Sequence, residues 1–191
     1  ERAPIPLIAD FMKNANQQFG FVPDRPRNDI EFKRAYAKAA IAAGLTPSQI
    51  VGVYAFETGG NGTYDTQAGV SARRPNAISP AVGYNQLLST NSVAMLAEHG
   101  AEILAVLRQK EKSLNGDAKR AMIRKIEAVK RMIASARSIP QRWSEYDKLA
   151  KKTAGGIGMH AIVLDIDIGP VVQVQKLLNS VLFARMKGYT A

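Results

Sequence analysis

Apolar side chains recur at helical spacing along most of the chain. Residues three and four positions apart lie on one face of an α-helix, so this pattern predicts amphipathic helices. Helices are expected at about 7–18, 28–44, 46–60, 91–108, 118–138, 141–152, 157–166 and 170–187. The pattern therefore predicts a mainly α-helical fold class.

Local signals mark where several of these helices begin. Asn28, followed by Glu31, resembles a capping box, and Thr46 begins a second one of the form Thr-x-x-Gln. Asp117 is placed to cap a helix after an Asn-Gly break, and Pro170 suits the first position of the last helix. These signals give most of the predicted helices a defined start.

Two stretches depart from the helical pattern. Residues 62–88 are rich in Gly, Pro, Asn, Ser and Thr, which predicts a loop with a short irregular β hairpin. Residues 1–27 contain several prolines and are expected to form an extended N-terminal arm on the body of the protein. A length of 191 residues suits one domain, 1–191, in which 101–152 forms a basic helical insert.

Composition excludes several kinds of site. The chain has no cysteine and two separated histidines, His99 and His160, which we interpret as structural. A disulfide scaffold, a thiolate zinc site and a thiol nucleophile are excluded, and we expect neither a metal nor a cofactor. No apolar run approaches the ~20 residues that span a bilayer, so no membrane span is expected. Because the sequence starts at Glu1 rather than Met, either a targeting segment has been removed or the chain has been trimmed. We expect the first, and with it a periplasmic or secreted protein.

The net charge of +10 is concentrated in one segment. Residues 101–152 carry 14 basic and 6 acidic side chains. They form either a helical hairpin with a solvated basic face or a surface that attracts a polyanion. Nucleic acid is a weaker third hypothesis and is not an expected partner, because no nucleic-acid-binding motif accompanies the charge.

Glu57 is the strongest candidate for chemistry. It shares a helical stripe with Ile50, Val53 and Tyr54, so its carboxylate points inward or into a cleft rather than standing as a solvated residue at a helix end. Partial burial and the negative end of the helix dipole should both raise its pKa, which suits a general acid. Asp65 is the only other carboxylate between Glu57 and residue 89.

A cluster of neutral polar side chains follows Glu57. Amides and hydroxyls both donate and accept hydrogen bonds, as carbohydrate recognition requires. The cluster consists of Asn61, Tyr64, Gln67, Tyr84, Asn85 and Gln86. The single tryptophan, Trp143, is interpreted as a packing anchor beside Pro140 in preference to a platform for a sugar ring.

The segments AGLTPSQIVGVYAFETGGNGTYD and ISPAVGYNQLLSTNS together resemble the soluble lytic transglycosylases and goose-type lysozymes of the lysozyme-like superfamily. That family has a catalytic glutamate in a Glu-Ser-Gly signature, followed by a Gly-x-x-Gln-Leu segment that lines the glycan cleft. Here these read Glu57-Thr58-Gly59 and Gly83-Tyr84-Asn85-Gln86-Leu87. Thr58 replaces the serine, the intervening stretch carries an insert with Arg73 and Arg74, and Asp165–Pro170 stands where a Tyr-Asn-Ala-Gly signature is expected.

The resemblance implies a lysozyme-like fold and cleavage of the β-1,4 bond between N-acetylmuramic acid and N-acetylglucosamine, with Glu57 as the single acid and base. The expected substrate-binding residues are Thr58, Tyr64, Asp65, Gln67, Tyr84, Asn85 and Gln86. A hydrolytic lysozyme that uses Asp65 is one alternative. A non-catalytic glycan-binding or secretion-system module is another, motivated by the missing C-terminal signature. The expected partners are peptidoglycan strands and, through 101–152, an anionic cell wall, and a monomer is expected.

Overall fold

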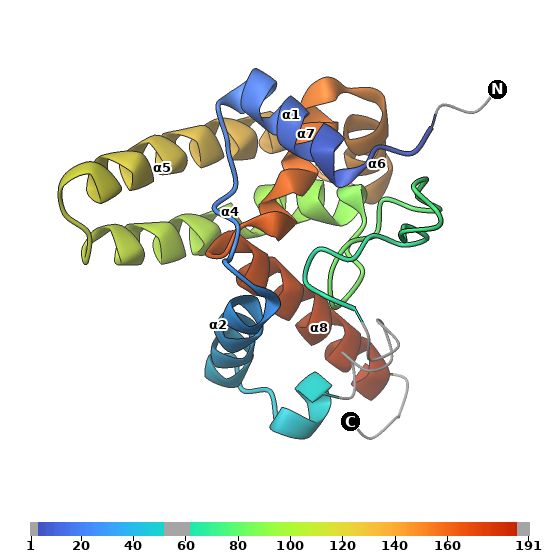
Figure 1. Cartoon of the computed structure of the whole chain (residues 1–191), viewed down its shortest axis with the longest axis horizontal. Helices are drawn as coiled ribbons and strands as arrows, with labels where there is room; N and C mark the ends of the chain where they lie inside the picture. Colours follow the sequence, from blue (N-terminus) through green and yellow to red (C-terminus); the bar gives the residue numbers. More distant parts are fainter. Residues whose placement is uncertain (1–3, 52–61, 187–191) are drawn as a thin grey trace.

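The computed structural model describes residues 4–51 and 62–186 (Figure 1). Its helices are α1 (Ile8–Phe19), α2 (Asp29–Ala42), α4 (Ser89–Glu111), α5 (Gly116–Arg137), α6 (Trp143–Lys152), α7 (Ala154–Met159) and α8 (Ile168–Met186), with a 3-10 helix, η1 (His160–Leu164). The described residues contain isolated β-bridges within 67–87 and no strand. The expected mainly α fold class is confirmed.

Helix α4 lies at the centre of the molecule and packs against α5, α6, α7, η1 and α8. Helices α4 and α5 form an antiparallel hairpin whose far end projects from the rest of the molecule (Figure 1). Helix α1 packs on α7, and α2 packs on α8. The predicted apolar stripe of α5, which includes Ile126 and Val129, is buried in this packing.

Helix α4 is longer than expected and is bent. His99 has non-helical backbone angles (φ −122°, ψ 21°), so two helical segments meet there. Next to it, Gly100 lies so close to α5 that a Cβ would be 3.0 Å from Ile133. The bend and this close approach bring the hairpin helices together at the base of the hairpin.

Several helix starts agree with the sequence signals. Asn28 accepts a hydrogen bond from the Glu31 amide (2.9 Å). Thr46 and Gln49 form the reciprocal capping box with distances of 2.8 and 3.2 Å, and a helix runs from residue 47 to 51, where the described stretch ends. The expected cap of α5 is wrong, because α5 begins at Gly116 and Asp117 lies inside its first turn, paired with Arg120.

The C-terminal helices differ from the prediction in their boundaries. The single helix expected at 157–166 is α7 followed by η1, and α8 begins at Ile168 rather than at Pro170. Buried Asp165 explains the earlier start. Its Oδ2 accepts hydrogen bonds from the amides of Asp167 (3.0 Å) and Ile168 (2.9 Å), which satisfies the first donors of α8.

The N-terminal stretch holds the expected helix as α1, between irregular residues 4–7 and 20–27. Phe11 is fully buried in α1 and meets the buried His160 ring edge to face. Trp143 is not a packing anchor in the core, because 52% of it is exposed.

A buried lysine joins α5 to the rest of the protein. Lys125 Nζ lies 2.6 Å from Asp165, 2.9 Å from Asp167 and 2.8 Å from Asp24. Burial alone would lower the pKa of Lys125, but Asp165 and Asp167 hold it above its ordinary value, so the lysine stays protonated. Lys110 of α4 also contacts Asp167 (2.7 Å), so both helices of the hairpin are tied to the segment before α8.

Among the described helices, none is by itself long and apolar enough to cross a membrane. Residues 154–164 and 168–180 pass that test only as a pair, bent by 93°.

Candidate functional site

The expected catalytic segment is only partly within the described structure. Glu57, Thr58 and Asn61 lie outside the described residues, as do Val53 and Tyr54 of the same helical stripe. The chain is described again from residue 62, five positions after Glu57. The roles expected of Glu57 and Thr58 therefore stay predictions.

The two motif-bearing segments lie side by side where they are described. The Gly83 amide donates to the Thr66 carbonyl (3.0 Å), and the Gln86 side-chain amide donates to the same oxygen (3.2 Å). An isolated antiparallel bridge joins Gln67 to Val82. The stretch that follows the Glu57 segment is thus held directly against the Gly-x-x-Gln-Leu segment.

The Gly83–Leu87 segment is a tight turn closed by hydrogen bonds between Val82 and Leu87, both 3.0 Å. Gly83 has φ 85°, and a Cβ there would collide with the side-chain amide of Gln173 on α8. Gln86 has φ 46°, the only left-handed non-glycine residue among those described. Glycine is therefore required at 83 by both backbone angle and space.

Tyr64 and Asp65 are held by Arg25. The guanidinium donates to the Tyr64 hydroxyl (3.0 Å) and pairs with the Asp65 carboxylate (2.6 Å), which also accepts the Thr63 hydroxyl (2.5 Å). Burial raises the pKa of the Tyr64 hydroxyl, and its ring stacks on Phe32 with centroids 4.8 Å apart. Asp65 is thus part of a surface ion pair.

Asp29 connects the two motif segments, and the sequence analysis did not identify it. Its Oδ1 accepts the Tyr64 amide (2.8 Å) and the Tyr84 hydroxyl (2.6 Å), while Lys33 lies 3.6 Å from its other oxygen. In the sequence, Asp29 is an ordinary acidic residue in the first turn of a helix, so no local signal marks these contacts.

Gln67, Tyr84 and Asn85 are almost completely buried. Gln67 donates to the Pro6 carbonyl (2.8 Å), which ties the N-terminal arm to the loop. The Asn85 side-chain amide donates to the Tyr36 hydroxyl (3.1 Å). Among the described residues, the Asn85 Oδ1 is the one buried side-chain atom without a hydrogen-bond partner. In the described structure, these three side chains are buried and stabilise the loop. Their substrate-binding role stays a prediction.

Gln86 is placed differently, because it lines a surface groove of about 420 Å³. The groove is lined by Thr66, Gln67, Ala68, Gly69, Val70, Ser71, Arg74 and Gln86. The Gln86 amide nitrogen donates to the carbonyls of Thr66 and Gly83, and no described residue donates to its Oε1. The lining combines neutral hydrogen-bonding side chains with small apolar residues, and it includes one cation, Arg74.

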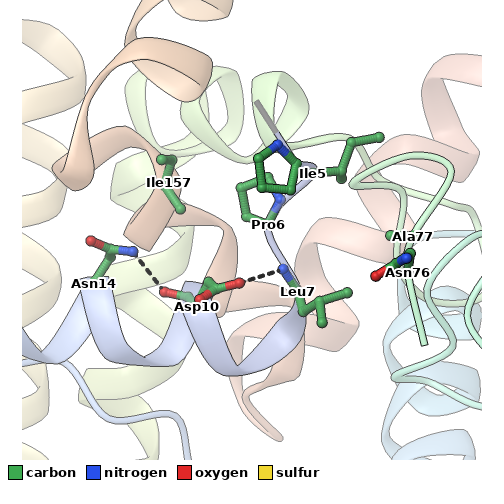
Figure 2. A pocket seen from close by; sticks show the side chains of 9 residues that line it. Ile5, Pro6, Leu7, Asp10, Asn14, Asn76, Ala77 and Ile157 are labelled. Carbon is green, nitrogen blue, oxygen red and sulfur yellow. Dashed lines mark hydrogen bonds between the residues drawn. The ribbon is translucent and has the colours of Figure 1, made fainter. Parts of the chain in front are cut away.

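Two further pockets adjoin the N-terminal arm. The larger, about 590 Å³, lies between the Pro4–Leu7 segment, α1, α7 and the loop at 76–77. Figure 2 shows Asn14 and Asp10 on α1, with Asn76 on the loop and Ile157 on α7. The second, about 460 Å³, shares Pro4–Pro6 with the first and lies against α6 and the start of α4. Both volumes fall within the range of about 300–1,000 Å³ typical of ligand pockets.

His160 joins this loop region to the helical body. Its Nε2 lies 2.7 Å from the Pro80 carbonyl and its Nδ1 lies 2.7 Å from the Ser92 hydroxyl. Since a carbonyl only accepts, Nε2 carries the proton, and neutral Nδ1 accepts from Ser92. Burial lowers the pKa of His160 to about 4, so the ring is neutral at pH 7. This agrees with the structural role expected of His160.

Asp24, Asp165 and Asp167 are the one group of carboxylates among the described residues whose oxygens lie close enough to share a cation, within 4.8 Å of one another. The Lys125 ammonium lies at bonding distance from all three. The position between the three carboxylates is thus occupied by the protein's own ammonium group, and the cluster serves as a structural anchor.

Comparisons with protein-family models, with characterised proteins and with solved structures find no match to this chain. The fold and the groove define a mainly α-helical protein with a polar surface loop.

Proposed function

We propose that the protein is a lysozyme-like enzyme that cleaves the glycan strands of peptidoglycan as a lytic transglycosylase. The observation that carries the proposal is the pairing of residues 62–67 with residues 82–87 beside the Gln86 groove. A groove lined by amides, hydroxyls and backbone groups suits a neutral glycan, whose hydroxyls both donate and accept hydrogen bonds. The residues of the groove also come soon after the candidate acid, Glu57, in the sequence.

The proposed reaction needs one carboxyl group. Glu57 protonates the glycosidic oxygen as the bond from that oxygen to C1 of N-acetylmuramic acid breaks. The resulting carboxylate then takes the proton of the 6-hydroxyl of the same sugar, whose oxygen bonds to C1 and closes a 1,6-anhydro ring. No water is consumed, and Glu57 regains its starting proton.

The contacts of Asp65 favour this route over hydrolysis. A second carboxylate acting as nucleophile or base must face the sugar. Asp65 instead pairs with Arg25 at 2.6 Å and accepts the Thr63 hydroxyl. In this proposal the basic segment 101–152 attracts the enzyme to an anionic cell wall, and the protein works in the cell envelope.

The test is Glu57→Gln, with Glu127→Gln as the matched control on the exposed side of α5. We expect purified wild-type protein to release 1,6-anhydro muropeptides from sacculi, detected by mass spectrometry. Glu57→Gln should reduce release at least about 100-fold, since a general acid contributes roughly 10²–10⁴-fold. Glu127→Gln should match the wild type.

Two results would redirect the proposal. Reducing-end products that depend on Asp65 would indicate a hydrolytic lysozyme. Binding to sacculi without any soluble product would indicate a non-catalytic glycan-binding module. That second function is favoured by the Asp165–Pro170 segment, where the anchor to Lys125 and the start of α8 replace the family's C-terminal signature. Full release by Glu57→Gln contradicts the assigned acid.

A further inference from the structure

Trp143 is exposed on the helix that forms one wall of the 460 Å³ pocket. It stands at the first position of α6 and is 52% exposed. Asp147 and Lys151 of the same helix line the pocket. Positions 143, 147 and 151 are separated by four residues each, so the indole lies on the same face of α6, one turn beyond the pocket.

The pocket offers polar groups on the same helix face as Trp143. Thr90 donates to Asp147 Oδ1 (2.7 Å), and Lys151 Nζ lies 3.0 Å from the same oxygen. Both contacts use Oδ1, so among the described residues Asp147 Oδ2 keeps its capacity to accept a hydroxyl. The side chains of Asp147 and Lys151 are 35% and 63% exposed, so a ligand can reach them.

Apolar groups complete the lining. Leu88 is 37% exposed at the start of α4, and Ala150 and Ile157 lie in the same pocket. The pocket shares the Pro4–Pro6 segment and Ile157 with the 590 Å³ pocket. An extended ligand can therefore contact α6 and pass along the N-terminal arm towards Asn14 and Asn76 (Figure 2).

We propose that Trp143 and the α6 pocket form a second glycan-binding site, which takes β-1,4-linked N-acetylhexosamine chains. The apolar face of a sugar ring stacks on the indole, its hydroxyls bind Asp147 and Lys151, and an acetamido methyl packs on Leu88. The choice of glycan rests on the proposed function, whereas the site itself rests on the exposed ring and the pocket.

The single tryptophan makes the site directly measurable. Chitotetraose, the β-1,4 tetramer of N-acetylglucosamine, is titrated into the full chain carrying Glu57→Gln, which prevents cleavage. We expect a saturable change in tryptophan fluorescence. Because the Gln86 groove can bind the same oligosaccharide, the dissociation constant from fluorescence should equal that of one of the binding steps that calorimetry resolves. Asp147→Ala should weaken binding about tenfold, and Ile123→Ala, on the exposed side of α5, should leave it unchanged.

Calorimetry on Trp143→Ala and Trp143→Phe completes the test. For the binding step that matches the fluorescence titration, we expect at least about tenfold weaker binding for alanine and a near-normal value for phenylalanine, which keeps an aromatic face. Because about half of Trp143 is exposed and it is not part of the buried core, both variants should keep the wild-type circular dichroism spectrum. Absence of binding, binding without a fluorescence change, or unchanged affinity of Trp143→Ala would overturn the site.

The two proposals fail independently. If wild-type protein cleaves sacculi but the tryptophan fluorescence does not change on titration, the second site is contradicted and the proposed enzyme activity is supported. A saturable fluorescence change without any cleavage supports the site and contradicts the enzyme.

Discussion

The basic hairpin and the polar loop are held in place by different kinds of interaction. Helices α4 and α5 are close in sequence, pack through apolar stripes and are anchored by one buried cation, Lys125. The loop 62–88 is held by hydrogen bonds to residues far along the chain, including Pro6, Asp29 and Gln173. The hairpin thus depends on apolar packing between helices close in sequence and on one charge cluster. The loop depends instead on many hydrogen bonds to other elements.

The largest effect is expected at the anchor of the hairpin. Lys125→Met leaves buried Asp165 without its cation, which should lower the free energy of unfolding by about 3–5 kcal/mol. Urea denaturation followed by circular dichroism measures this. The neighbouring exposed residue provides the control, since Arg124→Met should change stability by less than about 0.5 kcal/mol.

A second set of variants sharpens this result. Adding Asp165→Asn and Asp167→Asn to Lys125→Met removes the uncompensated charges and should recover part of the lost stability. A Lys125→Met protein as stable as the wild type would show that the hairpin is held by its apolar stripes alone.

The pH dependence of stability tests the contact that His160 makes between the loop and the helices. Its folded-state pKa of about 4 lies below the ordinary value of 6.5, so the unfolded chain takes up the proton first as the pH falls. Stability should be fully present above pH 6.5 and fall by about 3 kcal/mol as the pH approaches 4. The measurement is urea denaturation at a series of pH values. His160→Gln should be less stable at pH 7 and lack this loss, and an equal pH dependence in both proteins would contradict the assignment.

The smallest of the three effects is expected in the loop. Gly83→Ala combines left-handed strain with a collision against Gln173 and should cost about 2–3 kcal/mol. Gly44→Ala is the control, because Gly44 has φ 90° with nothing within 4 Å of a Cβ, so only the strain of about 1–2 kcal/mol applies. Thermal or urea unfolding distinguishes them, and equal losses would mean that Gln173 moves aside freely.

The difference between the hairpin and the loop also explains which features could be predicted from the sequence. The stripe that includes Ile126 and Val129, and the capping box of Thr46 and Gln49, arise from residues within a few positions of each other, so periodicity identified them. The start of α8 was missed because it depends on Asp165, whose burial is set by Lys125 forty residues earlier.

In the candidate site, the polar residues were identified by type but not by environment. Gln86 lines the groove, while Tyr84 and Asn85 turn inward to Asp29 and Tyr36. Adjacent side chains in a tight turn point in different directions. A five-residue motif gives no information on which of these directions faces solvent. The exposure of Trp143 was missed for a related reason, since a nearby proline gives no information on what packs over the ring.

The charge cluster around Lys125 also constrains the order in which the chain can complete its fold during synthesis. Asp24 leaves the ribosome first, Lys125 about a hundred residues later, and Asp165 and Asp167 last. A nascent chain that ends before residue 165 can form the α4–α5 hairpin, yet its buried lysine has only the largely exposed Asp24 as a partner. Docking of the hairpin is therefore coupled to the last part of the protein to be made.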